Sequence, residues 1–197
     1  MENLNVFIPT KKIRARIIKE YYGSERVVCL SCGNAVKALE EAGVNVISVS
    51  PVSRLNASAY LPPKEIQRCF NAPDVSSGCL PMHLIRKIGS EYYAIIQKAI
   101  PAGVQSQKTY LIPCGSGETI MALAHFIPMS RIIGYYSPAH AAIDFSYYTP
   151  LYDFILNNVA LININEPAGL EYFNKMMKSK KRIAILTAEA VCVKRKD

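Results

Sequence analysis

The sequence predicts an α/β protein built on an open, mostly parallel, twisted sheet with helices on both faces. Three observations lead to this prediction. Short apolar runs alternate with segments of helical character along the chain. Residues 26–51 read as a strand, a helix and a second strand, which is the βαβ unit of parallel sheets. Half of the 197 residues are hydrophobic, enough for a core in one large domain or two smaller lobes.

The first 51 residues give the clearest elements. A strand over 5–9 precedes a basic helix over 11–23, which we expect to end at Gly23. A buried strand follows, then a helix and a second strand: 26–30, 33–43 and 44–51. This order predicts that the two later strands pair in parallel.

The middle of the chain is rich in proline and turn-forming residues, and we read residues 52–90 as loops with short helices over 62–70 and 81–89. A separate helix is expected over 91–100. The remainder alternates again. We expect a strand over 108–113, a tight turn over 114–118, a helix over 119–127 and a strand over 130–138. A helix that leads into an extended segment follows over 151–162, then a helix over 169–180 and a closing strand or strand pair over 182–194.

The composition argues against several classes of protein. No apolar stretch approaches the length of about 20 residues that spans a membrane, and the N-terminus does not resemble a signal peptide. We therefore expect a cytoplasmic protein with its six cysteines reduced. Cys29 and Cys32 form a C-x-x-C pair, which is compatible with redox or zinc chemistry. We favour a structural role, because no further metal ligands follow at a suitable spacing, and we predict no metal site.

The formal net charge is +8, and the basic residues gather in three stretches, 11–19, 175–182 and 194–196. Such a surface suits nucleic acid or phosphorylated partners, or it serves solubility alone. No nucleic-acid-binding motif accompanies the charge, so we favour solubility and keep nucleic acid as a possible partner.

Two junctions between a strand and a helix contain a glycine turn: CLSCGNAVKAL and LIPCGSGETIMAL. Glycine lets the backbone turn sharply and approach a ligand, and the start of the next helix offers unpaired N–H groups to a phosphate. In the second turn Gly115 and Gly117 permit the bend, while Ser116 and Thr119 add hydroxyl groups. Glu118 would have to point away from a bound phosphate.

The first turn and the basic helix supply the other candidates. Asn34 offers both an amide donor and an acceptor, or it caps the helix that begins there. Lys12 precedes both turns, and a lysine that faces a partly apolar, positively biased site can lose its proton and form a Schiff base. Taken alone, Lys12 reads as a solvated residue of a basic run.

The order of these segments resembles the fold-type II pyridoxal-phosphate enzymes, which include cysteine synthase, threonine synthase, the serine and threonine dehydratases and the tryptophan synthase β chain. PTKKIRAR is similar to the family's Pro-Thr-Gly-Ser-Phe-Lys-Ile-Arg-Gly-Ala segment, CLSCGNAVKALEEAG to its Ser-Ser-Gly-Asn segment, and LIPCGSGETIMALA to its Gly-Ser-Gly-Gly-Thr cradle. RIIGYYSP and KKRIAILTAEA resemble the strands that follow. The resemblance covers most of the chain except residues 52–90, and Glu118 replaces a glycine of the cradle.

The resemblance implies a tryptophan synthase β-like fold and a role for each matched residue. Lys12 would form the Schiff base with pyridoxal 5'-phosphate, and Asn34 would bond the 3′ oxygen of its ring. The phosphate would lie on Gly115, Ser116, Gly117 and Thr119. Thr187 would contact the pyridine nitrogen, and the substrate carboxylate would lie at Ser31, Cys32 and Gly33.

The resemblance further implies two lobes. Residues 24–100 would form the smaller lobe, and residues 1–23 with 101–197 the larger. The expected activity is that of an amino-acid lyase or β-replacement enzyme, which acts on an amino acid as its small-molecule substrate and assembles as a homodimer. The lysine would act as general base at the substrate Cα.

Two other functions remain open. LIPCGSGETIMALA followed by RIIGYYSPAH is also similar to motif I of DNA methyltransferases, in which the glycine turn holds S-adenosylmethionine. Tyr135 and Tyr136 stand where that family has an acid for the ribose, and no Pro-Pro-Tyr catalytic segment is present. A non-catalytic α/β protein that binds nucleic acid through its basic face is the third reading.

Overall fold

The computed structural model describes residues 4–30, 34–49, 68–100, 109–136, 157–178 and 183–188. Its elements run in the order β1 (Leu4–Ile8), α1 (Thr10–Tyr22), β2 (Arg26–Leu30), α2 (Asn34–Glu41), β3 (Asn45–Val49), α4 (Met82–Ala99), β4 (Thr109–Pro113), α6 (Glu118–Leu123), the 3₁₀ turn η2 (Met129–Arg131), β5 (Ile132–Tyr136), β6 (Ala160–Asn163), α8 (Pro167–Lys178) and β7 (Ile183–Ala188).

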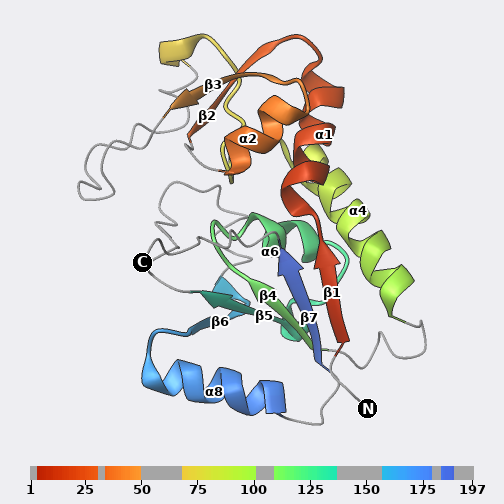
Figure 1. Ribbon diagram of the computed structural model, residues 1–197, viewed down its shortest axis with the longest axis vertical. Coiled ribbons are helices and arrows are strands. Elements are labelled where there is room, and N and C mark those ends of the chain that lie inside the picture. Colours follow the sequence, from red (N-terminus) through yellow and green to blue (C-terminus); the bar gives the residue numbers. More distant parts are fainter. Residues whose placement is uncertain are drawn as a thin grey trace, which may run out of the picture.

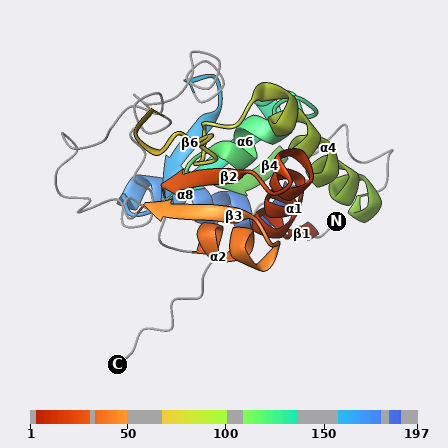
Figure 2. The ribbon, with the colours of Figure 1, turned by 90° about the horizontal axis from the view of Figure 1, so that it is seen from above.

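The described strands form two parallel sheets. Five strands form the larger one, in the order β1-β7-β4-β5-β6, and β2 pairs with β3 in the smaller one. Figure 1 shows the small sheet above the large one, and Figure 2 looks down on β2 and β3 lying side by side. The predicted fold class, an α/β fold with a parallel sheet, is confirmed.

Helices cover both faces of the large sheet, as β4 shows. Tyr110 and Ile112 belong to the main core together with side chains of α1, α4 and α6. Leu111 points to the opposite face, where it packs with Phe173 and Met177 of α8. Because successive strand residues alternate in direction, one strand buries side chains in two different layers. The near-continuous apolar sequence of β4 follows from this burial on both sides.

The two sheets draw their strands from different parts of the chain. β2 and β3 come from residues 24–100, whereas β1 comes from the segment before it and β4 to β7 from the segment after it. One buried cluster nevertheless includes residues of both parts, and α4 packs against both α1 and α6. The division into lobes at residues 24 and 100 stays a prediction.

The helix predicted to end at Gly23 does so. Gly23 has a φ of 59°, which favours glycine, and its N–H donates to the Lys19 carbonyl at 2.9 Å. The prediction of separate helices over 81–89 and 91–100 is wrong, because α4 is one helix of 18 residues. Gly89 lies inside this helix. A larger residue would not fit there, because its Cβ would come within 2.1 Å of the Ala122 carbonyl oxygen. This glycine permits close packing on α6 and does not end the helix.

Two other helix boundaries differ from the prediction. α6 ends at Leu123 and is shorter than the helix expected over 119–127. α8 begins at Pro167, a residue favoured in the first turn of helices. The extended end of segment 151–162 is confirmed as β6, while residues 151–156 and most of the helix predicted over 62–70 lie outside the described residues.

Candidate active site

Three predicted site segments meet at one edge of the large sheet. In the strand order, β7 lies between β1 and β4, and all three run parallel. Lys12 lies in the first turn of α1, directly after β1, and the glycine turn directly follows β4. The backbone of Thr187 pairs with Phe7 near the carboxyl end of β7. Carboxyl ends of parallel strands are where open α/β sheets bind ligands, so this edge is the candidate active site.

The glycine turn after β4 is open on its outer side. Gly115 is exposed, and no atom of the described residues lies within 4 Å of the position that a Cβ would take there. Gly117 has a φ of 82°, in the left-handed region, and it directly precedes α6. Because α6 has only six residues, its helix dipole adds little. A bound anion would rely on the backbone N–H groups of the turn and on the hydroxyl groups of Ser116 and Thr119.

Glu118, the acidic residue of this turn, is directed into the protein. Its Oε1 accepts from Nε of Arg14 at 2.5 Å, and its Oε2 accepts from the Gly78 N–H at 3.3 Å. Burial, the largest single influence, would lower the pKa of the Arg14 guanidinium, but the neighbouring groups together, the Glu118 carboxylate foremost, outweigh burial and the pKa is raised. The carboxylate is therefore compensated by a buried cation that comes from the helix of Lys12.

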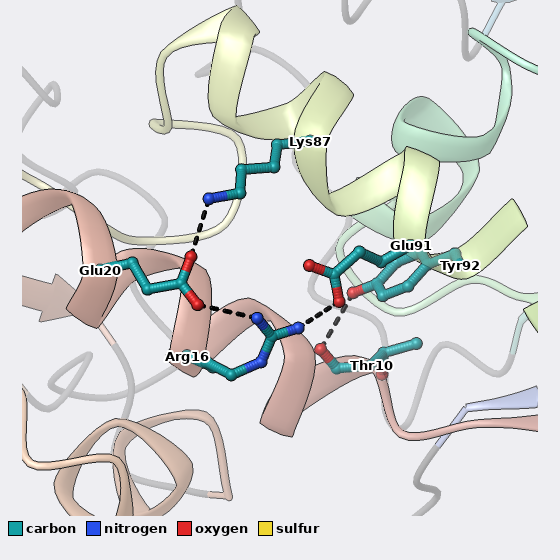
Figure 3. A network of polar contacts seen from close by, with 6 residues as sticks. All are labelled: Thr10, Arg16, Glu20, Lys87, Glu91 and Tyr92. Carbon is teal, nitrogen blue, oxygen red and sulfur yellow. Dashed lines mark hydrogen bonds and ion pairs between the residues drawn. The ribbon is translucent and has the colours of Figure 1, made fainter. Parts of the chain in front are cut away.

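The start of α1 is fixed from two sides. The buried Tyr92 of α4 donates its hydroxyl to the Thr10 carbonyl at 3.0 Å, as Figure 3 shows. Arg14, one turn later, holds Glu118 and also donates from Nη2 to the Val75 carbonyl. Lys12 thus lies between two buried polar anchors.

Lys12 itself is exposed, which differs from the partly apolar setting that we expected for it. The buried positions in the first turns of α1 belong to Thr10, Ile13 and Arg14. At 100° per residue, Lys12 lies about 200° around the helix from Arg14, whereas Lys11 lies only about 60° from it. Lys11 is half-buried and shares the helix face that points to Glu118.

The asparagine turn is described only in part. Asn34 is the first residue of α2 and is exposed, while Ser31, Cys32 and Gly33 lie outside the described residues. The Leu30 N–H, just before this turn, donates to the Ser76 hydroxyl at 2.7 Å.

The sequence reasoning missed the residues that hold these turns together, which come from segment 74–78. Its signal is the run PDVSSG: an aspartate followed two residues later by a serine is typical of an Asx turn. The Ser76 N–H indeed donates to Asp74 Oδ1 at 2.8 Å. Nothing in the sequence linked this turn to Arg14 or Glu118.

The cysteines near the site are protonated thiols. Burial raises the pKa of Cys29 to about 11, and it does the same for Cys114. Burial, followed by the nearby Asp74 carboxylate, also raises the pKa of Cys79. A redox pair needs a low thiol pKa, so the properties of Cys29 agree with a structural role, while Cys32 lies outside the described residues.

Two features are missing from the part of the chain that the structure describes. No three His, Cys, Asp or Glu side chains in this part gather closely enough to hold a metal ion. No helix in the described ranges has the length and apolar character that a membrane crossing requires.

The comparisons with known proteins identify the fold. No protein-family model matches the sequence, and no curated protein matches it significantly. Among solved structures, a T.th. threonine deaminase matches with a TM-score of 0.54 and 14% identity, over 89% of this chain and 79% of that one. Maize serine racemase matches with a TM-score of 0.51 and 14% identity, over 92% and 82%. The predicted resemblance to the tryptophan synthase β-like fold is confirmed at the level of structure, and at this identity the likeness concerns the fold alone.

Proposed function

We propose that the chain is a pyridoxal-phosphate-dependent amino-acid lyase or β-replacement enzyme, with Lys12 as the lysine that binds the cofactor. The observation that carries the proposal is the strand order β1-β7-β4. It brings together, at one sheet edge, the segments of Lys12, Thr187 and the glycine turn, which lie far apart in the sequence. The likeness to threonine deaminase and serine racemase supports this reading.

The residues at this edge fit such a cofactor. The open side of Gly115 leaves room for a phosphate, and the left-handed Gly117 turns the backbone into α6. Glu118 would repel a phosphate if it faced the turn, but its carboxylate accepts from Arg14 and Gly78 instead. The residue that departs from the family pattern is therefore compatible with anion binding.

Each residue has a defined task in the proposed reaction. When bound, pyridoxal phosphate supplies the electron sink that makes the substrate Cα proton acidic. Lys12 would hold the cofactor through its amine and, as a free amine, would take the proton from the substrate Cα as general base. Asn34 bonds the ring hydroxyl oxygen, and segment 31–33 holds the substrate carboxylate. Thr187 would offer a neutral hydroxyl to the ring nitrogen, and an uncharged partner there would favour elimination or replacement over transamination.

A spectroscopic titration tests the proposal. We expect purified protein to develop a visible absorption band with added pyridoxal phosphate, and Lys12→Ala to abolish it. Lys11→Ala is the matched control, because it removes the adjacent amine, and it should retain the band. A protein that stays colourless contradicts the proposed function. Loss of the band in Lys11→Ala alone would overturn the choice of Lys12 while keeping the cofactor.

The methyltransferase and the nucleic-acid-binding readings remain predictions, because no described contact bears on them. Calorimetry with S-adenosylmethionine tests the first. Salt-dependent retardation of DNA on a gel tests the second. The homodimer is likewise a prediction, which sedimentation of the purified protein checks.

A further inference from the structure

Segment 74–78, which we call the hub segment, contacts the lysine helix α1, the residue that follows the glycine turn, and the residue that precedes the asparagine turn. It comes from the region 52–90 that has no counterpart in the sequence resemblance. The Val75 carbonyl accepts from Nη2 of Arg14, in the helix of Lys12. The Gly78 N–H donates to Glu118 Oε2 at 3.3 Å, directly after the glycine turn.

The third contact reaches the asparagine turn. The Ser76 hydroxyl accepts from the Leu30 N–H at 2.7 Å, and segment 31–33 follows Leu30 directly. The three contacts involve partners that are distant in sequence, with separations of 61, 40 and 46 residues. One short segment therefore joins the lysine helix, the glycine turn and the asparagine turn.

The hub segment is buried and internally held. Asp74, Val75 and Ser76 are 1%, 0% and 7% exposed. Asp74 Oδ1 accepts from both the N–H and the hydroxyl of Ser76, at 2.8 and 2.5 Å. Val28 of β2 brackets the segment, because its N–H donates to the Pro73 carbonyl and its carbonyl accepts from the Val75 N–H, both at 2.8 Å. Buried groups held in this way cannot shift without leaving donors or acceptors unsatisfied.

We propose that the hub segment sets the lysine helix, the glycine turn and the asparagine turn relative to one another, and that Arg14, Ser76 and Glu118 are the positioning residues of this arrangement. The effect of these residues on cofactor binding rests on the proposed function, whereas their effect on the relative positions of the helix and the two turns does not. Glu118 is central to this arrangement, because one carboxylate binds both the lysine helix and the hub segment. A glycine at this position, as in the resembling family, would make neither contact.

Amide hydrogen exchange of Ser76→Ala tests the coupling. The lost hydroxyl should speed exchange of the Leu30 amide by about tenfold, since a half-buried donor loses its partner. If the segment couples these parts, exchange also speeds up at the amides of Met121 and Ala124, which donate to the Gly117 and Ile120 carbonyls just after the glycine turn and which Ser76 does not touch. Ser77→Ala, one residue along in the same segment, is the matched control and should leave both sets unchanged. Acceleration confined to Leu30 would overturn the proposal.

A second measurement keeps the proposal testable if Ser76→Ala does not fold. Exchange of the unmodified protein in low concentrations of urea should then show the amides of Leu30, Gly78, Met121 and Ala124 opening in one common step with one urea dependence. Separate steps with different urea dependences would overturn it.

Titration with pyridoxal phosphate separates the two proposals. If the unmodified protein binds it and Ser76→Ala binds about tenfold more weakly, both stand. Equal affinity of the two proteins overturns the role of the hub segment in the site. If the unmodified protein does not bind pyridoxal phosphate, the proposed function fails, and the exchange experiment alone decides whether the hub segment couples the turns.

Discussion

Arg14 and Arg16 lie two residues apart on α1, yet their ion pairs belong to different environments. Arg14 and Glu118 are buried, with side chains 9% and 7% exposed. Arg16 pairs at the surface with Glu20 and with Glu91 of α4, and in the latter pair the side chains are 51% and 31% exposed. Figure 3 shows this surface network, which Lys87 extends through Glu20. The same chemistry thus serves two purposes on opposite faces of one helix.

The buried and the exposed ion pairs differ in whether water can replace a partner that is lost. Water solvates Arg16 or Glu91 if either loses its partner, so the surface network orients α1 on α4 only weakly. No water replaces Arg14 beside Glu118, so removal of one partner leaves a buried charge. The buried pair therefore specifies how the lysine helix and the glycine turn meet, and the exposed network adds little to stability.

The largest expected effect concerns the buried pair. Arg14→Met should lower the free energy of unfolding by about 3–5 kcal/mol, because Glu118 then remains buried and unpaired. The double variant Arg14→Met with Glu118→Leu should recover a large part of this loss. Urea denaturation followed by circular dichroism measures both. Strictly additive losses in the double variant would mean that the two residues do not act as a pair.

The inner face of α4 packs closely on α6 at Gly89, a contact without charged groups that can be compared with the buried ion pair. Gly89→Ala should lower the free energy of unfolding by about 1–3 kcal/mol, because its Cβ would overlap the Ala122 carbonyl and push α4 from α6. Gly115→Ala is the matched control, since no described atom lies within 4 Å of its Cβ position. Thermal or urea denaturation compares the stability of the two variants. Equal stability of the two variants would show that the α4–α6 contact tolerates a larger spacing.

The contrast between buried and exposed groups extends to the thiols. Burial raises the pKa of Cys29 and of Cys114 to about 11, above the unfolded value of about 8.5. The folded state thus holds these protons more tightly, and the resulting stability is present below the unfolded pKa and is lost as the pH rises toward 11. Each thiol should contribute a loss of up to about 1.4 kcal/mol per pH unit in this window.

Urea denaturation between pH 8 and pH 10.5 measures this slope. Cys29→Ala should make it shallower, and Cys69→Ala, at an exposed cysteine, should leave it unchanged. An identical slope in the protein and in Cys29→Ala would contradict the assignment of the alkaline loss to this buried thiol.

The smallest effect belongs to the surface network. Arg16→Met should lower the free energy of unfolding by about 1 kcal/mol or less, and added salt should reduce the difference further. Its comparison with Arg14→Met is direct, because both variants remove an arginine from the same helix. A loss of equal size at both positions would end the distinction between the two faces of α1.

The sequence predicted those features that depend on local pattern. The strands and most helices followed from apolar periodicity, and the end of α1 followed from Gly23. The resemblance to known motifs predicted the fold and named Lys12, Thr187 and the glycine turn as parts of one site. The strand order β1-β7-β4 agrees with that grouping.

The sequence did not predict the features that depend on distant contacts. Arg14 and Glu118 are 104 residues apart, and no local pattern announces their pairing. Gly89 resembles a helix end in the sequence, but glycine is required there because the backbone of Ala122 in α6 lies against it. The hub segment lies in a region without periodicity, and its backbone groups Val75 O and Gly78 N carry no signal in the sequence. The exposure of Lys12 agrees with its interpretation as a solvated residue of a basic run and differs from the partly apolar setting expected of a Schiff-base lysine.

The most direct test of the central claim is to identify the lysine that pyridoxal phosphate occupies. The protein is incubated with the cofactor, reduced with borohydride to fix the linkage, digested and analysed by mass spectrometry. We predict a single stoichiometric modification at Lys12. Scattered substoichiometric labelling of surface lysines, or a dominant label on a lysine outside α1, would contradict the account.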